Sequence, residues 1–95
     1  MIAMERSEMR PAVIKALYRL EKPYRDKGQV GMIKVRDIAR QSGLEDFWVG
    51  PTLKALFQEG LCTEPYESGA TDAVQWVNGL TDQGREAAES LLPEG

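Results

Sequence analysis

The fold of this chain is decided by residues 38–61, which read IARQSGLEDFWVGPTLKALFQEGL. The second half of this stretch carries an apolar stripe with the spacing of one helix face, made by Val49, Leu53, Leu56 and Phe57. Gly43 precedes the stripe and Gly60 follows it, and glycine readily takes the left-handed conformation that ends a helix. The stretch therefore predicts two helices joined by a short turn, and Leu61 is expected to fold back on Leu56 where the second helix stops.

The first of these helices is expected over residues 36–42, and the second is expected to begin near Glu45 or Asp46. The pair Gly50-Pro51 complicates the second helix, because a proline in a helix interior costs about 3 kcal/mol and disfavours helical geometry at the residue before it. Two alternatives stay open. Either the helix starts at Pro51 after an irregular approach, or it is kinked there.

The residues before this stretch predict one helix and one short strand. Pro11 suits the first turn of a helix, so residues 11–21 are expected to be helical. The helical spacing continues through Val13, Ile14, Leu17 and Leu20. Residues 1–10 are expected to form an N-terminal arm or an extra helical turn. Proline, glycine and dense charge predict a loop over residues 22–28, and a strand is expected over residues 32–35.

The residues after the stretch predict a β wing over about residues 61–80 and a closing helix over about residues 81–92. Two strands are expected in the wing, over residues 61–66 and 74–80, with a turn rich in Gly, Ser, Thr and Asp between them. Thr81 is expected to cap the closing helix, since its hydroxyl can accept from a free N–H of the first turn.

The composition predicts one globular domain, residues 1–95. A chain of 95 residues suffices for one core but not for two, and 42% apolar and 28% charged residues are typical of globular proteins. No apolar run approaches the roughly 20 residues of a membrane span, and the first residues lack the apolar segment of a signal peptide. A cytoplasmic location without membrane contact is therefore expected.

The residue types that most active sites need are missing. The chain has no histidine and a single cysteine, Cys62, so we expect no internal disulfide, no zinc site and no Ser-His-Asp or Cys-His arrangement. Glycine-rich phosphate loops are also absent from the sequence. Carboxylate pairs such as Glu45 with Asp46 are explained by helix caps and solvated faces. We expect a noncatalytic protein with no cofactor and no metal, in which Cys62 is buried as an apolar residue.

Three short motifs follow one another along the chain. They are Ile38-Ala39-x-x-x-Gly43, residues 53–61 (LKALFQEGL) and residues 80–86 (LTDQGRE). In this order they resemble winged helix-turn-helix transcription regulators of the broad MarR and PadR type. The resemblance implies an α+β, mostly helical fold with a three-helix core, a two- to three-stranded β wing and a C-terminal helix. It also implies DNA binding, with the third helix in the major groove, and usually a dimer.

The predicted surface fits DNA poorly. The outward face of the third helix is expected to present Phe47, Trp48, Gly50, Pro51 and Lys54. Bases in the major groove are read mainly by Arg, Lys, Asn or Gln, so only Lys54 suits that role. Acidic residues in or beside the predicted wing, which oppose phosphate binding, are Glu64, Glu67 and Asp72. The charge is uneven as well, with net +4 over residues 1–45 and net −7 over residues 46–95.

Two arginines offer a different surface. Arg36 and Arg40 lie one helical turn apart, at positions similar to those that contact the DNA backbone in the family. They are preceded by Lys22, Arg25, Lys27 and Lys34. The alternative is a solvated face whose charges form ion pairs with Asp26 and Asp37. In the DNA interpretation, Arg36 and Arg40 act together with Lys54.

Phe47 and Trp48 also leave two interpretations open. They pack into the core, with Trp48 under the hairpin or against Tyr24, or they form an exposed apolar patch beside Gly50 and Pro51. Exposed aromatic patches are typical of protein interfaces. The expected function is a noncatalytic, regulatory winged-helix binding module whose partner is DNA or a protein. A homodimer through the first and last helices is an option, because their apolar faces exceed the needs of so small a core.

Overall fold

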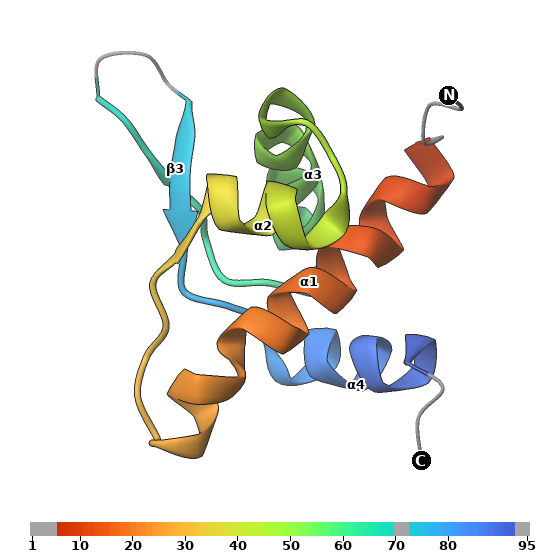
Figure 1. Cartoon of the computed structure of the whole chain (residues 1–95), viewed down its shortest axis with the longest axis vertical. Coiled ribbons are helices and arrows are strands. Elements are labelled where there is room, and N and C mark those ends of the chain that lie inside the picture. Colours follow the sequence, from red (N-terminus) through yellow and green to blue (C-terminus); the bar gives the residue numbers. More distant parts are fainter. Residues whose placement is uncertain (1–5, 70–72, 93–95) are drawn as a thin grey trace.

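The computed structural model describes residues 6–69 and 73–92, and in this part the chain forms four helices and one three-stranded sheet (Figure 1). In chain order the elements are α1 (Arg6–Asp26), β1 (Ile33–Lys34), α2 (Val35–Ser42), α3 (Asp46–Gln58), β2 (Tyr66–Glu67), β3 (Val74–Val77) and α4 (Asp82–Leu91). The strand order is β1-β3-β2, and both pairs are antiparallel. The predicted α+β, mostly helical class is confirmed.

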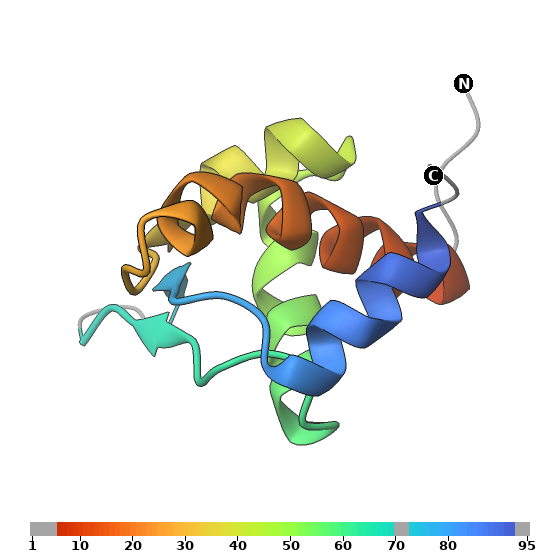
Figure 2. The same cartoon turned by 90° about the horizontal axis from the view of Figure 1, so that it is seen from below.

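The central element is α1. It contacts α2, α3, α4 and β1, and Figures 1 and 2 show it crossing the molecule with α4 alongside. The buried apolar residues form one cluster, whose fully buried members include Leu17, Ile38, Leu53, Val77 and Ala88. One core therefore joins the four helices to the sheet. Within the two described ranges, every helix is too short or too polar to cross a membrane.

α1 is longer than the sequence predicts. Residues 6–10 form an extra helical turn, so Pro11 lies inside the helix rather than in its first turn. The loop predicted over residues 22–28 is wrong, because the helix continues beyond Pro23. Side chains hold this last part: the Arg25 guanidinium lies 4.4 Å from the centre of the Tyr18 ring and donates to the Tyr18 carbonyl oxygen at 3.2 Å. Such contacts offset the local cost of an interior proline.

The β strands are shorter than predicted. Of the segments expected over residues 61–66 and 74–80, only Tyr66 and residues 74–77 are in strands; β2 extends to Glu67, and its pairing with β3 contains a register shift. An isolated bridge between Cys62 and Leu80 continues the pairing beyond these strands. β2 is an edge strand in the sheet, and the strand predicted over residues 32–35 forms as the short β1.

Hydrogen bonds connect the end of α3 to the start of α4. The Leu61 N–H donates to the Leu56 carbonyl oxygen at 2.9 Å, which is the fold-back that the sequence predicts. Thr81 caps α4 as predicted, because its hydroxyl accepts from the Gly84 N–H at 3.1 Å, and the same hydroxyl donates to the Gly60 carbonyl oxygen at 2.6 Å. A Cβ on Gly84 would overlap with the Leu61 carbonyl, so only glycine fits this approach. The motifs 53–61 and 80–86, which are separate in the sequence, thus contact each other, and we call this contact the joint.

Candidate functional site

The turn between α2 and α3 is as the sequence predicts. α2 ends at Gly43, whose φ of 82° is left-handed and whose N–H donates to the Ala39 carbonyl oxygen at 2.9 Å. α3 then starts at Asp46 and runs through Pro51, so the alternative in which the helix begins at Pro51 is wrong. The N-cap residue, Glu45, makes no side-chain cap hydrogen bond, and Pro51 has no N–H to donate to the preceding turn. This end of α3 therefore has little local support.

Three residues on the outward face of α3 are exposed as predicted. Phe47 is 62% exposed, and Pro51 and Lys54 are exposed beside it. Phe47 thus belongs to the surface patch of the second interpretation and not to the core. The ring of Phe47 contacts the neighbouring ring of Trp48, with the two ring centres 5.1 Å apart.

Two other residues predicted for this face are placed elsewhere. Gly50 is buried, because β3 lies over it and a Cβ there would come within 3.4 Å of the Val74 Cβ. Trp48 is half-buried and packs against the core cluster. The expectation that Gly50 faces outward is therefore wrong because of the position of β3, which the sequence of α3 does not contain. Trp48 follows the first of its two interpretations in part, since it packs against the core.

The exposed face of α3 borders a groove, which we call the α3–β3 groove. It consists of two adjoining hollows of about 430 and 600 Å³, and both are lined by Asp46, Phe47, Ala73 and Val74. The first hollow extends along α3 to Gly50, Pro51 and Lys54. The second extends to Lys34, Val35 and Arg36 and to Gln75 and Trp76 of β3. The groove thus joins α3, β3 and the start of α2.

The only cation of α3 is not free to bind a ligand. Lys54 Nζ lies 2.5 Å from Glu67 Oε2 on β2, and both side chains are partly exposed. Exposed ion pairs of this kind are worth about 0–1 kcal/mol in stability. The pair nevertheless places the Glu67 carboxylate beside Lys54, the one residue of α3 that suited the recognition of DNA bases. The positive charge of Lys54 in the first hollow is therefore largely compensated.

The cations of α2 have a different environment. Arg36 and Arg40 are exposed, and neither takes part in an ion pair within the described residues; the same holds for Lys34 at the end of β1. The ion pair expected at Asp26 is formed by Lys22, at 2.8 Å. The one expected at Asp37 is missing from the ion pairs of the described residues.

Trp76 lies at the far side of the groove. Its ring stacks on Tyr66 of the neighbouring strand, with ring centres 3.9 Å apart and an angle of 9° between the planes. The register pairs Tyr66 with Trp76 and Glu67 with Val74, which leaves Gln75 as an extra residue on β3. Such a β-bulge redirects the side chains that follow it. The stacked pair therefore joins β2 to β3 through their side chains as well as their backbones.

The single cysteine is an inert residue of the core. Cys62 is buried as predicted, its thiol donates to the Leu53 carbonyl oxygen at 3.4 Å, and burial raises the pKa of the thiol to about 12. A neutral thiol is a poor nucleophile and a poor metal ligand. Across residues 6–69 and 73–92, no group of three or more Cys, Asp or Glu residues is arranged to hold a metal ion.

A buried carboxylate lies away from the groove and was not singled out by the sequence. Glu21 of α1 is 8% exposed, accepts from the Leu80 N–H at 3.3 Å and lies 3.5 Å from Arg25 Nη1. Burial raises the pKa of Glu21 above its usual value of 4.5, although the hydrogen bond from Leu80 and the charge of Arg25 oppose this. Its contacts join α1 to the chain just before α4, which indicates a structural role.

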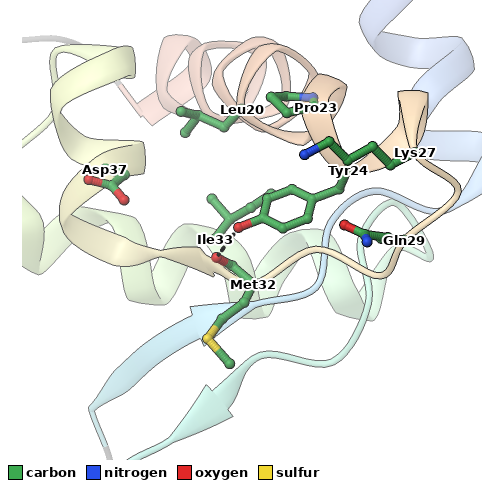
Figure 3. A pocket seen from close by; sticks show the side chains of 8 residues that line it. All are labelled: Leu20, Pro23, Tyr24, Lys27, Gln29, Met32, Ile33 and Asp37. Atoms are coloured by element: carbon green, nitrogen blue, oxygen red, sulfur yellow. Dashed lines mark hydrogen bonds between the residues drawn. The ribbon is translucent and has the colours of Figure 1, made fainter.

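Another hollow, of about 400 Å³, lies between the end of α1 and the start of α2 (Figure 3). The Tyr24 ring forms its centre, and the Tyr24 hydroxyl donates weakly to the Met32 carbonyl oxygen at 3.4 Å. Lys27, just after α1, and Asp37, in α2, also line the hollow. The sequence could not indicate this hollow, because Pro23 and Tyr24 fall in the segment predicted to be a loop.

The apolar faces that suggest a homodimer are largely used inside the chain. α1 and α4 contact each other, and α1 buries Val13, Ile14 and Leu17 in the core. Among the described residues of these two helices, the only large apolar side chain that is exposed is Leu91, at 40%.

Comparisons with known proteins gave no relatives. The chain matches no protein-family model, and neither the curated proteins nor the solved structures contain a significant match. The function is therefore argued from the surface described above.

Proposed function

We propose that the chain is a noncatalytic, cytoplasmic winged-helix module that binds a protein partner in the α3–β3 groove. The element order supports a winged helix, since α2 and α3 form a helix-turn-helix and an antiparallel hairpin and a closing helix follow. The pairing of β1 with β3 completes a small sheet of the kind that accompanies such a wing. Because one fold hosts many functions, the partner has to be argued from the groove.

The exposure of Phe47 carries this proposal. A phenylalanine has roughly 150–250 Å² of surface to bury, and each Å² of apolar area that a partner covers contributes about 25 cal/mol. Phe47 is 62% exposed and stands beside Pro51 and the buried Val74, in a hollow large enough for an apolar side chain. Aromatic residues that line such hollows are typical anchors of protein interfaces. The groove thus offers a partner a favourable apolar contact.

Sequence-specific DNA binding, as in a transcription regulator, is the second candidate. It is favoured by Arg36 and Arg40, which are exposed on α2 without ion pairs among the described residues. It is opposed by the ion pair of Lys54 with Glu67, since that carboxylate lies where the wing would approach phosphates. Phe47 and Pro51 also provide no side-chain donor for base edges.

Position-specific crosslinking tests the proposal. Phe47 is replaced by the photoreactive p-benzoylphenylalanine in cells that express the protein, and the matched control carries the same substitution at Phe57, which is 41% exposed on the same helix and lines neither hollow. We expect a discrete protein adduct from position 47 and none from position 57.

A titration with random-sequence duplex DNA completes the experiment. Binding at low salt that weakens steeply as salt rises, and that Arg36→Glu with Arg40→Glu abolishes, would replace the protein-binding proposal by DNA binding. Identical adducts at positions 47 and 57 would also refute it, because the groove would then have no special role.

A further inference from the structure

The two ends of the α3–β3 groove differ in chemistry. The α3 end is apolar, with Phe47 and Pro51 on its rim, Gly50 at its floor and Val74 on its far wall. Its one cation, Lys54, is neutralised by Glu67. This end can take a large apolar side chain, and because Asp46 also lines it, it offers no free cation to an acidic group.

The α2 end is basic. Lys34 and Arg36 line the second hollow, and Arg40 follows Arg36 by four residues, so the two arginines share one face of α2. All three side chains are exposed, and none of them is in an ion pair within the part of the chain that the structure describes. Asp46, shared by both hollows, is the acidic residue that lines this end. The free cations therefore outnumber the carboxylate here.

From this arrangement we infer the chemistry of the occupant: an acidic segment of a partner protein that carries one large apolar side chain. The apolar side chain lies between Phe47 and Val74, and the carboxylates of the segment face Lys34 and Arg36. Arg40 lies one turn further along α2, outside the hollow, and adds to the positive charge of this end. This inference rests on the proposed function. It adds the charge of the segment and the end of the groove at which its acidic residues lie. Charge pairs at the rim mainly guide association, whereas a covered aromatic anchor contributes most of the affinity.

A nucleic acid satisfies this surface less well. Its phosphates repeat along the whole strand, whereas the free cations are confined to the α2 end of the groove, Asp46 lines both hollows, and Glu67 is already paired with Lys54 at the α3 end. A protein segment can place its carboxylates at the α2 end alone and present an apolar side chain to Phe47. The uneven distribution of charge thus favours a peptide over a polyanion.

A selection from a random peptide library displayed on phage tests this inference. Wild-type protein serves as the target, and enriched peptides are measured against purified variants whose folding is checked by circular dichroism. We expect peptides with one Trp, Phe or Leu and a cluster of Asp and Glu to one side of it. Phe47→Ala should weaken their binding about tenfold, whereas the matched Phe57→Ala leaves it unchanged.

Charge reversal provides the sharper measurement. Arg36→Glu with Arg40→Glu should weaken the acidic peptides several-fold and remove the salt dependence of their association. A second selection on that double variant should enrich Lys and Arg in place of Asp and Glu. Arg19→Glu is the matched control, because Arg19 is an exposed cation of α1 that lines neither hollow.

The outcomes separate this inference from the proposed function. Peptides that need Phe47 but show no acidic bias, or that keep their bias after charge reversal, overturn the inference and leave a protein-binding groove. A library that yields no Phe47-dependent peptide overturns both. In that case a titration with duplex and single-stranded DNA shows whether Arg36 and Arg40 serve a nucleic acid instead.

Discussion

The two ends of α3 are held in different ways. At the C-terminal end, the backbone groups are paired by the Leu61 fold-back, and the Thr81 hydroxyl bonds to Gly60. At the N-terminal end there is no side-chain cap, a proline interrupts the hydrogen-bond ladder, and Phe47 is exposed. The difference teaches that α3 follows the local rules for ending a helix at one end and breaks them at the other. Such violations are expected where a surface serves binding.

Among the changes at the two ends of α3, the largest loss of stability is expected at Gly84, where the start of α4 lies closest to Leu61. Gly84→Ala would push a methyl group into the Leu61 carbonyl, and because both contact atoms belong to backbone, the joint has to open. We expect a loss of about 3 kcal/mol in the free energy of unfolding, measured by urea denaturation. Gly69→Ala is the control, since no atom of the described residues lies within 4 Å of a Cβ at that position. Equal stability of the two variants would show that the joint is not tightly packed.

The next effect concerns the N-terminal end and has the opposite sign. Pro51→Ala restores an N–H to the helix ladder, which should outweigh the entropy that proline removes from the unfolded chain. We expect a gain of about 1–2 kcal/mol in thermal or urea unfolding. Pro65→Ala, outside the helices, should give no gain. A destabilised Pro51→Ala variant would mean that the proline ring, and not the missing hydrogen bond, decides stability there.

A smaller loss is expected at the cap of α4. Thr81→Ala removes both the bond from the Gly84 N–H and the bond to the Gly60 carbonyl oxygen. Loss of an N-cap costs about 1 kcal/mol, and Thr81→Ser should recover most of it because it keeps the hydroxyl. Urea denaturation of the two variants measures this difference, and a serine variant as unstable as the alanine variant would contradict the capping role.

The buried Glu21 of α1 makes the stability of the protein depend on pH. Because burial raises the pKa of Glu21 in the folded state, the folded protein holds this proton more tightly than the unfolded chain. The stabilising contribution is complete below the usual pKa of 4.5 and is lost as pH rises through the raised value. Wild type should therefore lose stability relative to Glu21→Gln as pH increases over this window, measured by urea denaturation in a pH series. A constant difference between them would contradict the shift.

The smallest effect on stability is expected at the groove. Phe47→Ala removes an exposed ring, so the free energy of unfolding should change by no more than about 0.5 kcal/mol. The buried Leu53→Ala, on the same helix, should cost about 2–5 kcal/mol. Thermal denaturation of both variants compares them. A large loss for Phe47→Ala would show that its ring supports the fold and is not held ready for a partner.

The exposed patch was only half predictable from the sequence. Helical spacing places Phe47, Gly50 and Lys54 on one side of α3, and the exposure of Phe47 and Lys54 agrees with it. Gly50 is buried because Val74, distant in sequence, lies over it. The pairing of Lys54 with Glu67 was equally out of reach, since it depends on where β2 lies relative to α3.

The sequence alone determined the helix ends that depend on residues close by in the chain. Gly43, Gly60 and Thr81 end or begin helices because each supplies a backbone conformation or a hydroxyl to groups within a few residues. Only the tertiary structure decided how far α1 extends through Pro23 and which residues of α3 meet solvent. Burial and charge pairing depend on segments that are brought together by the core, and a local pattern does not contain their positions.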